Sequence, residues 1–358
     1  MKKRVLHIIS SVNWRGGEQQ VDAIFNYSHA DFDYYIFCPE NAKLHKRNEA
    51  KKSNIFTYKK RFGADILAAF KLKIVCAENQ IDLIHLHDSH AINTYYIACL
   101  FGLKIPAVIH RHVNFPVTKR WKYNAEKIKK IICVSETVKA GFQSFITEEK
   151  LVVIQPGIEI SQWSVNNNSQ KIKKELNLSN EHKIIGIVAA LEKEKNIEEF
   201  LEIAKKVIEQ NDNFHFVLIG DGSLMHTYTQ STKQQKKNIH FLGFREDVKE
   251  LICGFDVFLF TSKNEGFPLV LLEAMATKIP ILSNNFPSVN ELLQHQKNGL
   301  IYKNVEDAVY KLQLLNTETA QRKQLVENAF QFVQQFDITL MNQRIADVYK
   351  SIFTCIKK

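Results

Sequence analysis

Paired cysteines and long apolar runs are both missing from this chain of 358 residues. The six cysteines stand far apart, without a CxxC pair or metal-ligand spacing, which indicates the reduced thiols of a cytosolic protein. No run reaches the ~18 apolar residues of a membrane-spanning helix, so only binding to a membrane surface stays open. A hydrophobic fraction of 45% and a charged fraction of 24% exclude a disordered or collagen-like chain and predict a globular protein of about two domains.

The net charge of +10 belongs entirely to the first half of the chain. Residues 1–158 hold 24 Lys/Arg and 14 Asp/Glu, whereas residues 159–358 hold 24 of each. A basic half joined to a neutral half indicates that the two halves face different partners. Nucleic acid, an anionic membrane surface and an acidic substrate all fit this pattern.

Short apolar runs alternate with helical stretches along both halves, which predicts parallel sheets with crossover helices. The expected strands of the first half are residues 5–9, 34–38, 83–86, 107–109 and 131–134, followed by one that ends near the Pro-Gly turn within 151–160. Those of the second half are residues 183–189, 214–219, 239–242 and 257–260, and one that begins at 280. The fold class is therefore α/β, with two Rossmann-like doubly wound domains.

The expected domain boundary follows the Pro-Gly turn. We predict an N-terminal domain of residues 1–158, a C-terminal domain of residues 159–340, and a final helix of about 341–358 that crosses back to the N-terminal domain. Because ligands of doubly wound folds bind beyond the carboxyl ends of the strands, a site is expected in a cleft between the domains.

The sharpest motif is the segment SKNEGFPLVLLEAMA at residues 262–276, which follows an apolar strand and opens a helix at Pro268. Free amides and the dipole at a helix N-terminus favour anions. Glu265 and Glu273 beside such amides suit a ligand with both phosphates and vicinal hydroxyls. The alternative is an ordinary helix with acidic residues near its beginning.

The Glu-x7-Glu pattern resembles the signature of GT-B glycosyltransferases, of the retaining group 1 (family 4) type. Further segments resemble motifs of this family and occur in its order: WRGGE at 14–18, HLHDSH at 85–90, HRHVNFP at 110–116, CVSE at 133–136, PGIE at 156–159, GDG at 220–222 and LGF at 242–244. Each motif is weak alone, but the ordered set runs from residue 14 to about 276 and is specific.

The resemblance implies the roles of the site residues. Glu265 contacts hydroxyls of the donor sugar, and Glu273 binds the ribose of the nucleotide. Lys195 grips the diphosphate, and His110 lies beside the donor sugar, with His112 as its rival for that position. The remaining donor-binding residues are Gly16 and Gly17 of the Gly-Gly loop, the backbone of Gly266, Phe267 and Leu269, and Gly220 and Phe244.

One position departs from the family pattern. The family usually has Gly-Arg-Leu followed by a lysine, with both cations on the diphosphate, but the arginine position here is Ala190. A nearby cation stabilises the leaving diphosphate, so the loss of one could cost on the order of a few kcal/mol. Lys193 and Lys263 are the cations that could substitute.

No metal and no cofactor are expected. Asp31-Phe32-Asp33 matches the DxD of metal-dependent transferases, but the expected strand follows this motif instead of preceding it. His85, His87 and His90 have a loose metal-like spacing, yet we expect them to shape the cleft.

Basic and aromatic residues mix in two segments of the first half. Phe62, Ile66, Phe70 and Ile74 recur every four residues beside Lys59, Lys60 and Arg61, and a second cluster spans residues 119–130. Such a helix can lie at a membrane interface, although a core-packing helix with a solvated rim is the alternative. The resemblance favours the membrane, and no nucleic-acid motif appears.

The resulting function is transfer, with retention, of a hexose-type sugar from a UDP-sugar or GDP-sugar to a lipid-linked or glycan acceptor in cell-envelope or lipopolysaccharide biosynthesis. The enzyme would be cytoplasmic and peripheral at the inner face of the plasma membrane. The alternatives are a nucleotide-sugar epimerase of GT-B shape, a nucleotide-sugar-binding protein without catalysis, and a basic nucleic-acid binder.

Overall fold

The computed structural model describes residues 2–61, 65–164, 170–233, 237–317 and 319–356. The chain forms two compact units, one of residues 1–157 with 338–358 and one of residues 158–337. The change of unit after Gly157 lies one residue before the expected boundary, and the return to the first unit begins at Ile338 rather than near 341. Among the described residues, no helix combines the length and the apolar character needed to cross a membrane.

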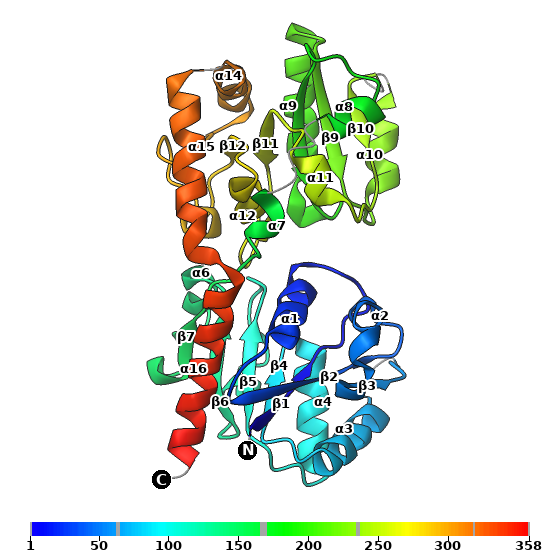
Figure 1. Cartoon of the computed structure of the whole chain (residues 1–358), viewed down its shortest axis with the longest axis vertical. Coiled ribbons are helices and arrows are strands. Elements are labelled where there is room, and N and C mark those ends of the chain that lie inside the picture. Colours follow the sequence, from blue (N-terminus) through cyan, green and yellow to red (C-terminus); the bar gives the residue numbers. More distant parts are fainter. Residues whose placement is uncertain (1, 62–64, 165–169, 234–236, 318, 357–358) are drawn as a thin grey trace. The chain divides into compact units, whose positions relative to one another are not determined.

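The first unit is built on a seven-stranded parallel sheet with the order β3-β2-β1-β4-β5-β6-β7 (Figure 1). Its strands are β1 Lys3–Ile8, β2 Phe32–Pro39, β3 Ile55–Tyr58, β4 Leu83–Leu86, β5 Ala107–Arg111, β6 Ile128–Cys133 and β7 Leu151–Val153. Its helices are α1 Gly16–Asn26, α2 Lys43–Arg47, α3 Ile66–Glu78, α4 Ser89–Leu100, α5 Trp121–Asn124, α6 Glu136–Ala140 and α16 Ile338–Ile356, with short 3-10 turns at Glu49–Asn54 and Glu148–Lys150.

The last helix, α16, completes the core of the first unit. Met341, Ile345, Tyr349 and Ile352 are all at most 4% exposed and share one apolar cluster with Val5, Val108 and other strand residues. A side chain of this size stabilises the fold by roughly 1.5–3 kcal/mol when it is fully buried. The C-terminal helix is thus a structural part of the N-terminal unit.

The second unit has a six-stranded parallel sheet with the order β10-β9-β8-β11-β12-β13. Its strands are β8 Lys183–Val188, β9 Phe214–Ile219, β10 Ile239–Phe241, β11 Val257–Phe260, β12 Ile281–Ser283 and β13 Leu300–Ile301. Its helices are α7 Ser161–Ser164, α8 Lys171–Glu175, α9 Ile197–Gln210, α10 Met225–Ser231, α11 Val248–Ile252, α12 Leu269–Ala276, α13 Pro287–Asn290, α14 Val305–Asn316 and α15 Ala320–Val333, with short 3-10 turns at Lys193–Lys195 and Gln334–Phe336.

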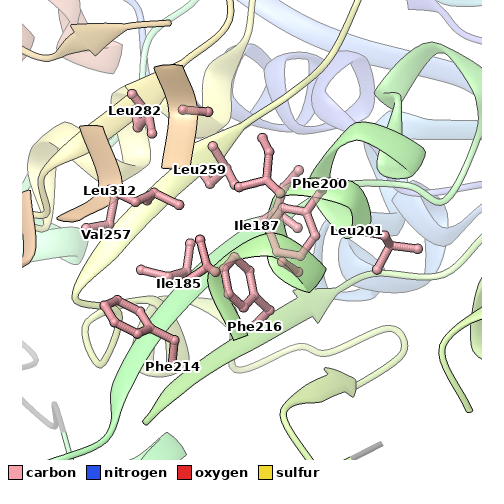
Figure 2. Close-up of a cluster of buried hydrophobic side chains, with 14 of the residues drawn as sticks. Ile185, Ile187, Phe200, Leu201, Phe214, Phe216, Val257, Leu259, Leu282 and Leu312 are labelled. Atoms are coloured by element: carbon pink, nitrogen blue, oxygen red, sulfur yellow. The ribbon is translucent and has the colours of Figure 1, made fainter. Parts of the chain in front are cut away.

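Helix α9 shows how the second core forms. Phe200, Leu201 and Ala204 lie on one face of the helix and are buried, whereas its glutamates mostly face solvent. Figure 2 shows Phe200 beside Ile187 and Phe216 of the neighbouring strands. This packing fixes the sheet whose carboxyl edge carries the site loops.

The expectation of two doubly wound parallel α/β halves is confirmed. Each expected strand is present within a few residues, but β3 and β13 were missed. Strand β3 is only four residues long and follows a polar stretch, and β13 has two residues, so neither carries a strong periodic signal.

Candidate functional site

The second unit gathers four of the expected motifs at one edge of its sheet. The loops after β8, β9, β10 and β11 carry Ala190, Gly220, Phe244 and Glu265 respectively. Because all four strands are parallel, these loops emerge at the same carboxyl edge, where doubly wound folds bind ligands.

Lys195 and Glu265, 70 residues apart in sequence, form an ion pair at this edge. The side chains are only 25% and 16% exposed. Backbone contacts fix both loops, because Thr261 donates through Oγ1 to the carbonyl of Lys195 at 3.1 Å and the amide of Lys263 donates to the carbonyl of Glu194 at 2.8 Å. The pair presents a cation and a carboxylate side by side, which suits a ligand that carries both phosphate and hydroxyl groups.

Glu273 lies in α12 and is 8% exposed. Burial raises the pKa of its carboxyl from 4.5 to about 7, and the charge of Lys249 offsets part of that rise. Among the described residues, no hydrogen bond or ion pair reaches this carboxylate. A buried carboxyl without a protein partner is costly unless a ligand satisfies it.

The segment before α12 separates the roles of backbone and side chain. Phe267 is buried, and its ring lies 6.0 Å from that of Phe336, so its side chain belongs to the core. Ser288 donates through its hydroxyl to the carbonyl of Glu265 at 2.6 Å and fixes the turn that holds Gly266. Leu269 is the first residue of the helix. Any ligand contact from Gly266 and Phe267 therefore comes from their backbone, whereas the amide of Leu269 donates to the carbonyl of Phe267 at 3.0 Å.

Gly220 and the Ala190 loop are packed against each other. Gly220 has φ +138°, and a Cβ there would stand 1.9 Å from the carbonyl oxygen of Ala189. The amide of Leu191 donates to the carbonyl of Asp221 at 3.1 Å. Ala190, which occupies the position of the family's arginine, therefore lies in a loop that is anchored by the turn after β9. Lys193 and Lys263 are exposed and have no ion pair among the described residues.

Phe244 stands at the rim of the same edge and is 49% exposed. It follows Gly243, whose carbonyl accepts a hydrogen bond of 2.8 Å from the amide of Gly220. An exposed aromatic ring in this place offers a flat apolar surface for a nucleotide base.

In the first unit the structure brings the Gly-Gly loop and the histidine loop together. Gly16 and Gly17 open α1, and a Cβ at Gly17 would lie 3.8 Å from Cγ of His112. The protein itself would tolerate a small side chain at Gly17, so any strict need for glycine would come from a ligand.

The two candidate histidines differ in access. His110 lies in β5 and is 2% exposed, whereas His112 follows the strand and is partly exposed beside Gly17. Burial is the largest cause that lowers both pKa values, that of His112 to about 4, so both rings are neutral at pH 7. His112 is therefore the histidine of this pair that a ligand can reach.

His85 and His87 are buried, and His90 is exposed on α4. Asp88 accepts hydrogen bonds from the amides of His90 and Ala91 and from the amide and hydroxyl of Ser10, so it caps α4 and anchors the loop after β1. His7 of β1 joins this group as a buried residue that sequence reasoning did not select. Its position between Val5 and Ile9 on one strand face was the available signal.

Two family models match the chain. The model described as "Glycosyltransferase Family 4" matches residues 14–162, and "Glycosyl transferases group 1" matches residues 168–332. The chain belongs to the group 1 glycosyltransferases. The expected family resemblance is confirmed, and the fold is GT-B.

Individual relatives of this glycosyltransferase are distant but cover most of the chain. An Escherichia coli UDP-Gal:alpha-D-GlcNAc-diphosphoundecaprenol alpha-1,3-galactosyltransferase is 26% identical over 80% of this chain and 79% of its own. A Bacillus anthracis N-acetyl-alpha-D-glucosaminyl L-malate synthase is 27% identical over 81% of this chain and 78% of its own. The structure of Anabaena HepE in complex with UDP and glucose superposes with a TM-score of 0.81 at 21% identity, over 97% of this chain and 99% of that one.

Proposed function

We propose that this glycosyltransferase moves a hexose-type sugar from a UDP-sugar to a lipid-linked or glycan acceptor, with retention of anomeric configuration. The observation that carries the proposal is the carboxyl edge of the second sheet. There the Lys195–Glu265 pair and the exposed Phe244 ring stand on neighbouring loops, and the unpartnered Glu273 carboxyl lies in α12, the helix that follows the Glu265 loop. The named substrates of the Escherichia coli relative and the UDP bound to HepE support UDP over GDP.

Each residue of this edge has a proposed task. Phe244 stacks on the base, Glu273 accepts hydrogen bonds from the ribose hydroxyls, and Lys195 neutralises charge on the diphosphate. Glu265 turns from Lys195 towards the sugar hydroxyls when the donor binds. The backbone of Gly266, Phe267 and Leu269, which follows Glu265 directly, is assigned to the sugar and phosphate, and the amide of Leu269 would exchange its hydrogen bond to the carbonyl of Phe267 for one to the donor.

The proposed chemistry needs no protein nucleophile. The bond from the anomeric carbon to the diphosphate oxygen breaks while the acceptor hydroxyl attacks the same face of the sugar. A diphosphate oxygen takes the acceptor proton, so the products are the glycoside and UDP. We assign Gly16, Gly17 and His112 of the first unit, with His110 behind His112, to the acceptor and sugar end of the reaction. Donor binding uses Lys195 in place of a metal ion.

The test begins with the donor. UDP-sugars and GDP-sugars are added to the purified protein in the presence of a chelator, and the melting temperature is compared, because a ligand of the native state raises it. Turnover with a diphospholipid-linked sugar follows, and NMR of the product defines the anomeric configuration. Glu265→Gln should abolish transfer more than UDP binding, and full activity of this variant would refute its role.

Ala190 favours one second candidate, a nucleotide-sugar-binding protein without catalysis. This protein lacks the cation that the family pattern places at that position. A UDP-sugar that raises the melting temperature but is never consumed with any of a broad set of acceptors would support it. Restored turnover in Ala190→Arg would locate the defect.

We also propose that the first unit binds an anionic membrane surface through α3. The expected apolar stripe faces solvent, with Ile66 at 56%, Phe70 at 51% and Ile74 at 40% exposure. Phe62 of that stripe lies outside the described residues. Leu67, Leu100 and Phe101 are exposed as well, and the rings of Phe70 and Phe101 meet edge to face at 6.3 Å.

Basic residues lie beside this apolar patch. Lys59, Arg61 and Lys71 line a small pocket together with Tyr58, Leu67 and Ala68. Trp121, in the second basic cluster, is 61% exposed. Apolar side chains beside basic residues suit a bilayer with anionic headgroups, and such a position would bring the enzyme to a lipid-linked acceptor.

A further inference from the structure

Five histidines gather in the core of the first unit. They come from three adjacent strands and the residue positions directly beyond them: His7, His85, His87, His110 and His112. His7 and His85 are partners in the register of β1 and β4, so they project from the same face, and His87 follows His85 by two residues on that face. This is the face that Tyr349 and its neighbours of α16 cover.

Several ring nitrogens in this cluster have no protein partner. Among the described residues, His7 Nε2, His85 Nε2 and both nitrogens of His110 are buried and form no hydrogen bond. Leaving such a buried group unsatisfied destabilises the fold, because the group has lost its hydrogen bonds to water and gained none in return. Because the fold keeps these histidines buried in spite of that penalty, we infer that a ligand binds some of their ring nitrogens.

Three of the rings converge. His7, His85 and His87 each offer a ring nitrogen within 4.8 Å of the others, and His7 Nδ1 already lies 2.9 Å from His87 Nε2. Ligand nitrogens around a tetrahedral ion with bonds of about 2.0–2.1 Å stand roughly 3.3 Å apart. Small rotations of the rings would therefore complete three ligands.

The outer contacts fix two of the three ring nitrogens that would bind, those of His85 and His87. His85 Nδ1 lies 2.6 Å from the hydroxyl of Tyr349, and His87 Nδ1 lies 3.2 Å from Nε2 of His112. When both Nδ1 atoms donate to these acceptors, the lone pairs of the two Nε2 atoms face the cluster. Metal-binding histidines commonly donate their second N–H in this way.

We propose that His7, His85 and His87 bind one divalent transition-metal ion of the zinc type, with Tyr349 as the outer partner of His85. Neutral imidazole prefers Zn²⁺ and its neighbours over Mg²⁺ or Ca²⁺. The ion would join β1, β4 and α16 and would serve the fold of the first unit rather than the donor.

The experiment uses the full-length protein after removal of metal with a chelator. Isothermal titration with ZnCl₂ should give one equivalent per chain, and Co²⁺ should give the absorption bands of a tetrahedral site. Bound Zn²⁺ should also raise the melting temperature, since the unfolded chain lacks the assembled site. A folded protein that takes up no Zn²⁺ overturns the proposal.

Variants place the ion. His85→Gln should weaken Zn²⁺ binding at least 10-fold, and Tyr349→Phe, which keeps all three ligands, should weaken it by roughly 10–100-fold. The control His90→Gln removes an exposed histidine of the same segment and should change nothing. If His85→Gln does not fold, Tyr349→Phe decides.

Two results would contradict this assignment. One is binding that survives both His85→Gln and Tyr349→Phe. The other is binding that depends on His110 and His112 but not on His85, which would assign the ion to the second histidine triad. Because all of these metal-binding measurements are made without the donor, a negative result leaves the transferase proposal unaffected.

Discussion

The buried Glu273 carboxyl links the proposed nucleotide site to the pH dependence of protein stability. Its pKa is raised from 4.5 to about 7 by burial, so the folded state holds a proton that the unfolded chain releases. Stability is then full below about pH 4.5 and falls as the pH rises towards 7. At 1.36 kcal/mol per pKa unit, the loss is about 3 kcal/mol.

The substitution Glu273→Gln should remove this loss of stability at high pH. We expect the variant to be more stable than the native protein at pH 8 and to differ little from it at pH 5, as measured by chemical unfolding without nucleotide. UDP binding should reverse the order, because the ribose hydroxyls would stabilise the ionised carboxylate, so the native protein should gain UDP affinity as the pH rises through 7. If the UDP affinity of the variant and that of the native protein depend on pH in the same way, Glu273 does not belong to the nucleotide site.

Single site residues could be predicted from the sequence, but their partners could not. The Glu-x7-Glu motif located Glu265 and Glu273 without a structure, because the helix start and the motif spacing are local. The pairing of Glu265 with Lys195 joins two loops that are 70 residues apart, and the choice between His110 and His112 depends on which position along β5 and its end lies beside Gly17. Such facts need the sheet topology, which composition and periodicity do not contain.

At the scale of elements, the turn after β9 depends on one glycine. Gly220→Ala would place a methyl group 1.9 Å from the carbonyl of Ala189 at φ +138°. We expect the free energy of unfolding of the second unit to fall by about 3 kcal/mol or more, since both strain and overlap contribute. Thermal unfolding followed by calorimetry would show the shift.

Gly243→Ala is the matched control for that turn. Gly243 also has a positive φ, +66°, but a Cβ there meets nothing within 4 Å. Only the left-handed backbone is penalised, by about 1 kcal/mol. If both variants lose the same stability, the contact between the β8 and β9 loops does not have the importance assigned to it.

Helix α3 illustrates why an element can be predicted while its orientation is not. The spacing of Ile66, Phe70 and Ile74 predicted a helix correctly, and the alternative was that this stripe enters the core. The structure instead buries Ala68, Ala69, Leu72, Val75 and Cys76. Because the segment is apolar on nearly every side, its periodicity does not distinguish the buried face from the exposed one.

The exposed face of α3 gives a testable prediction for membranes. Replacing Leu67 and Phe70 by serine should weaken sedimentation with vesicles that contain anionic lipid, by tenfold or more, because each side chain contributes on the order of 1.5 kcal/mol when buried. The control replaces Tyr310 and Leu314 of α14, which are 60% and 45% exposed in the other unit. Equal loss in both variants would mean nonspecific adsorption.

Across the whole molecule, the difference in net charge between the two units is larger once α16 is counted with the first unit. Counting α16 and its tail with the first unit gives that unit a net charge of +13 and leaves the second unit at −3. The unit with the proposed donor site is thus slightly acidic, and its cations at the site are local ones such as Lys195. The general positive field belongs to the unit proposed for an acceptor at an anionic surface.

The division of the chain also predicts which truncations are tolerated. Ending the chain after Asp337 removes α16 and exposes the core around Val5 and Val108 that Ile345, Tyr349 and Ile352 cover. The lost burial, roughly 1.5–3 kcal/mol for each large side chain, is comparable with the whole stability of a domain. Calorimetry should therefore show that the transition of the first unit disappears while that of the second unit persists.

A shorter truncation separates this effect from the loss of any chain end. Ending the chain after Thr354 keeps every residue of α16 that belongs to the core, and it removes the exposed Cys355 together with the basic end of the tail. Both transitions should then remain within a few degrees of those of the full chain. If the first unit still melts cooperatively after truncation at Asp337, the helix is an appendage, and the assignment of residues 338–358 to the N-terminal unit is wrong in energetic terms.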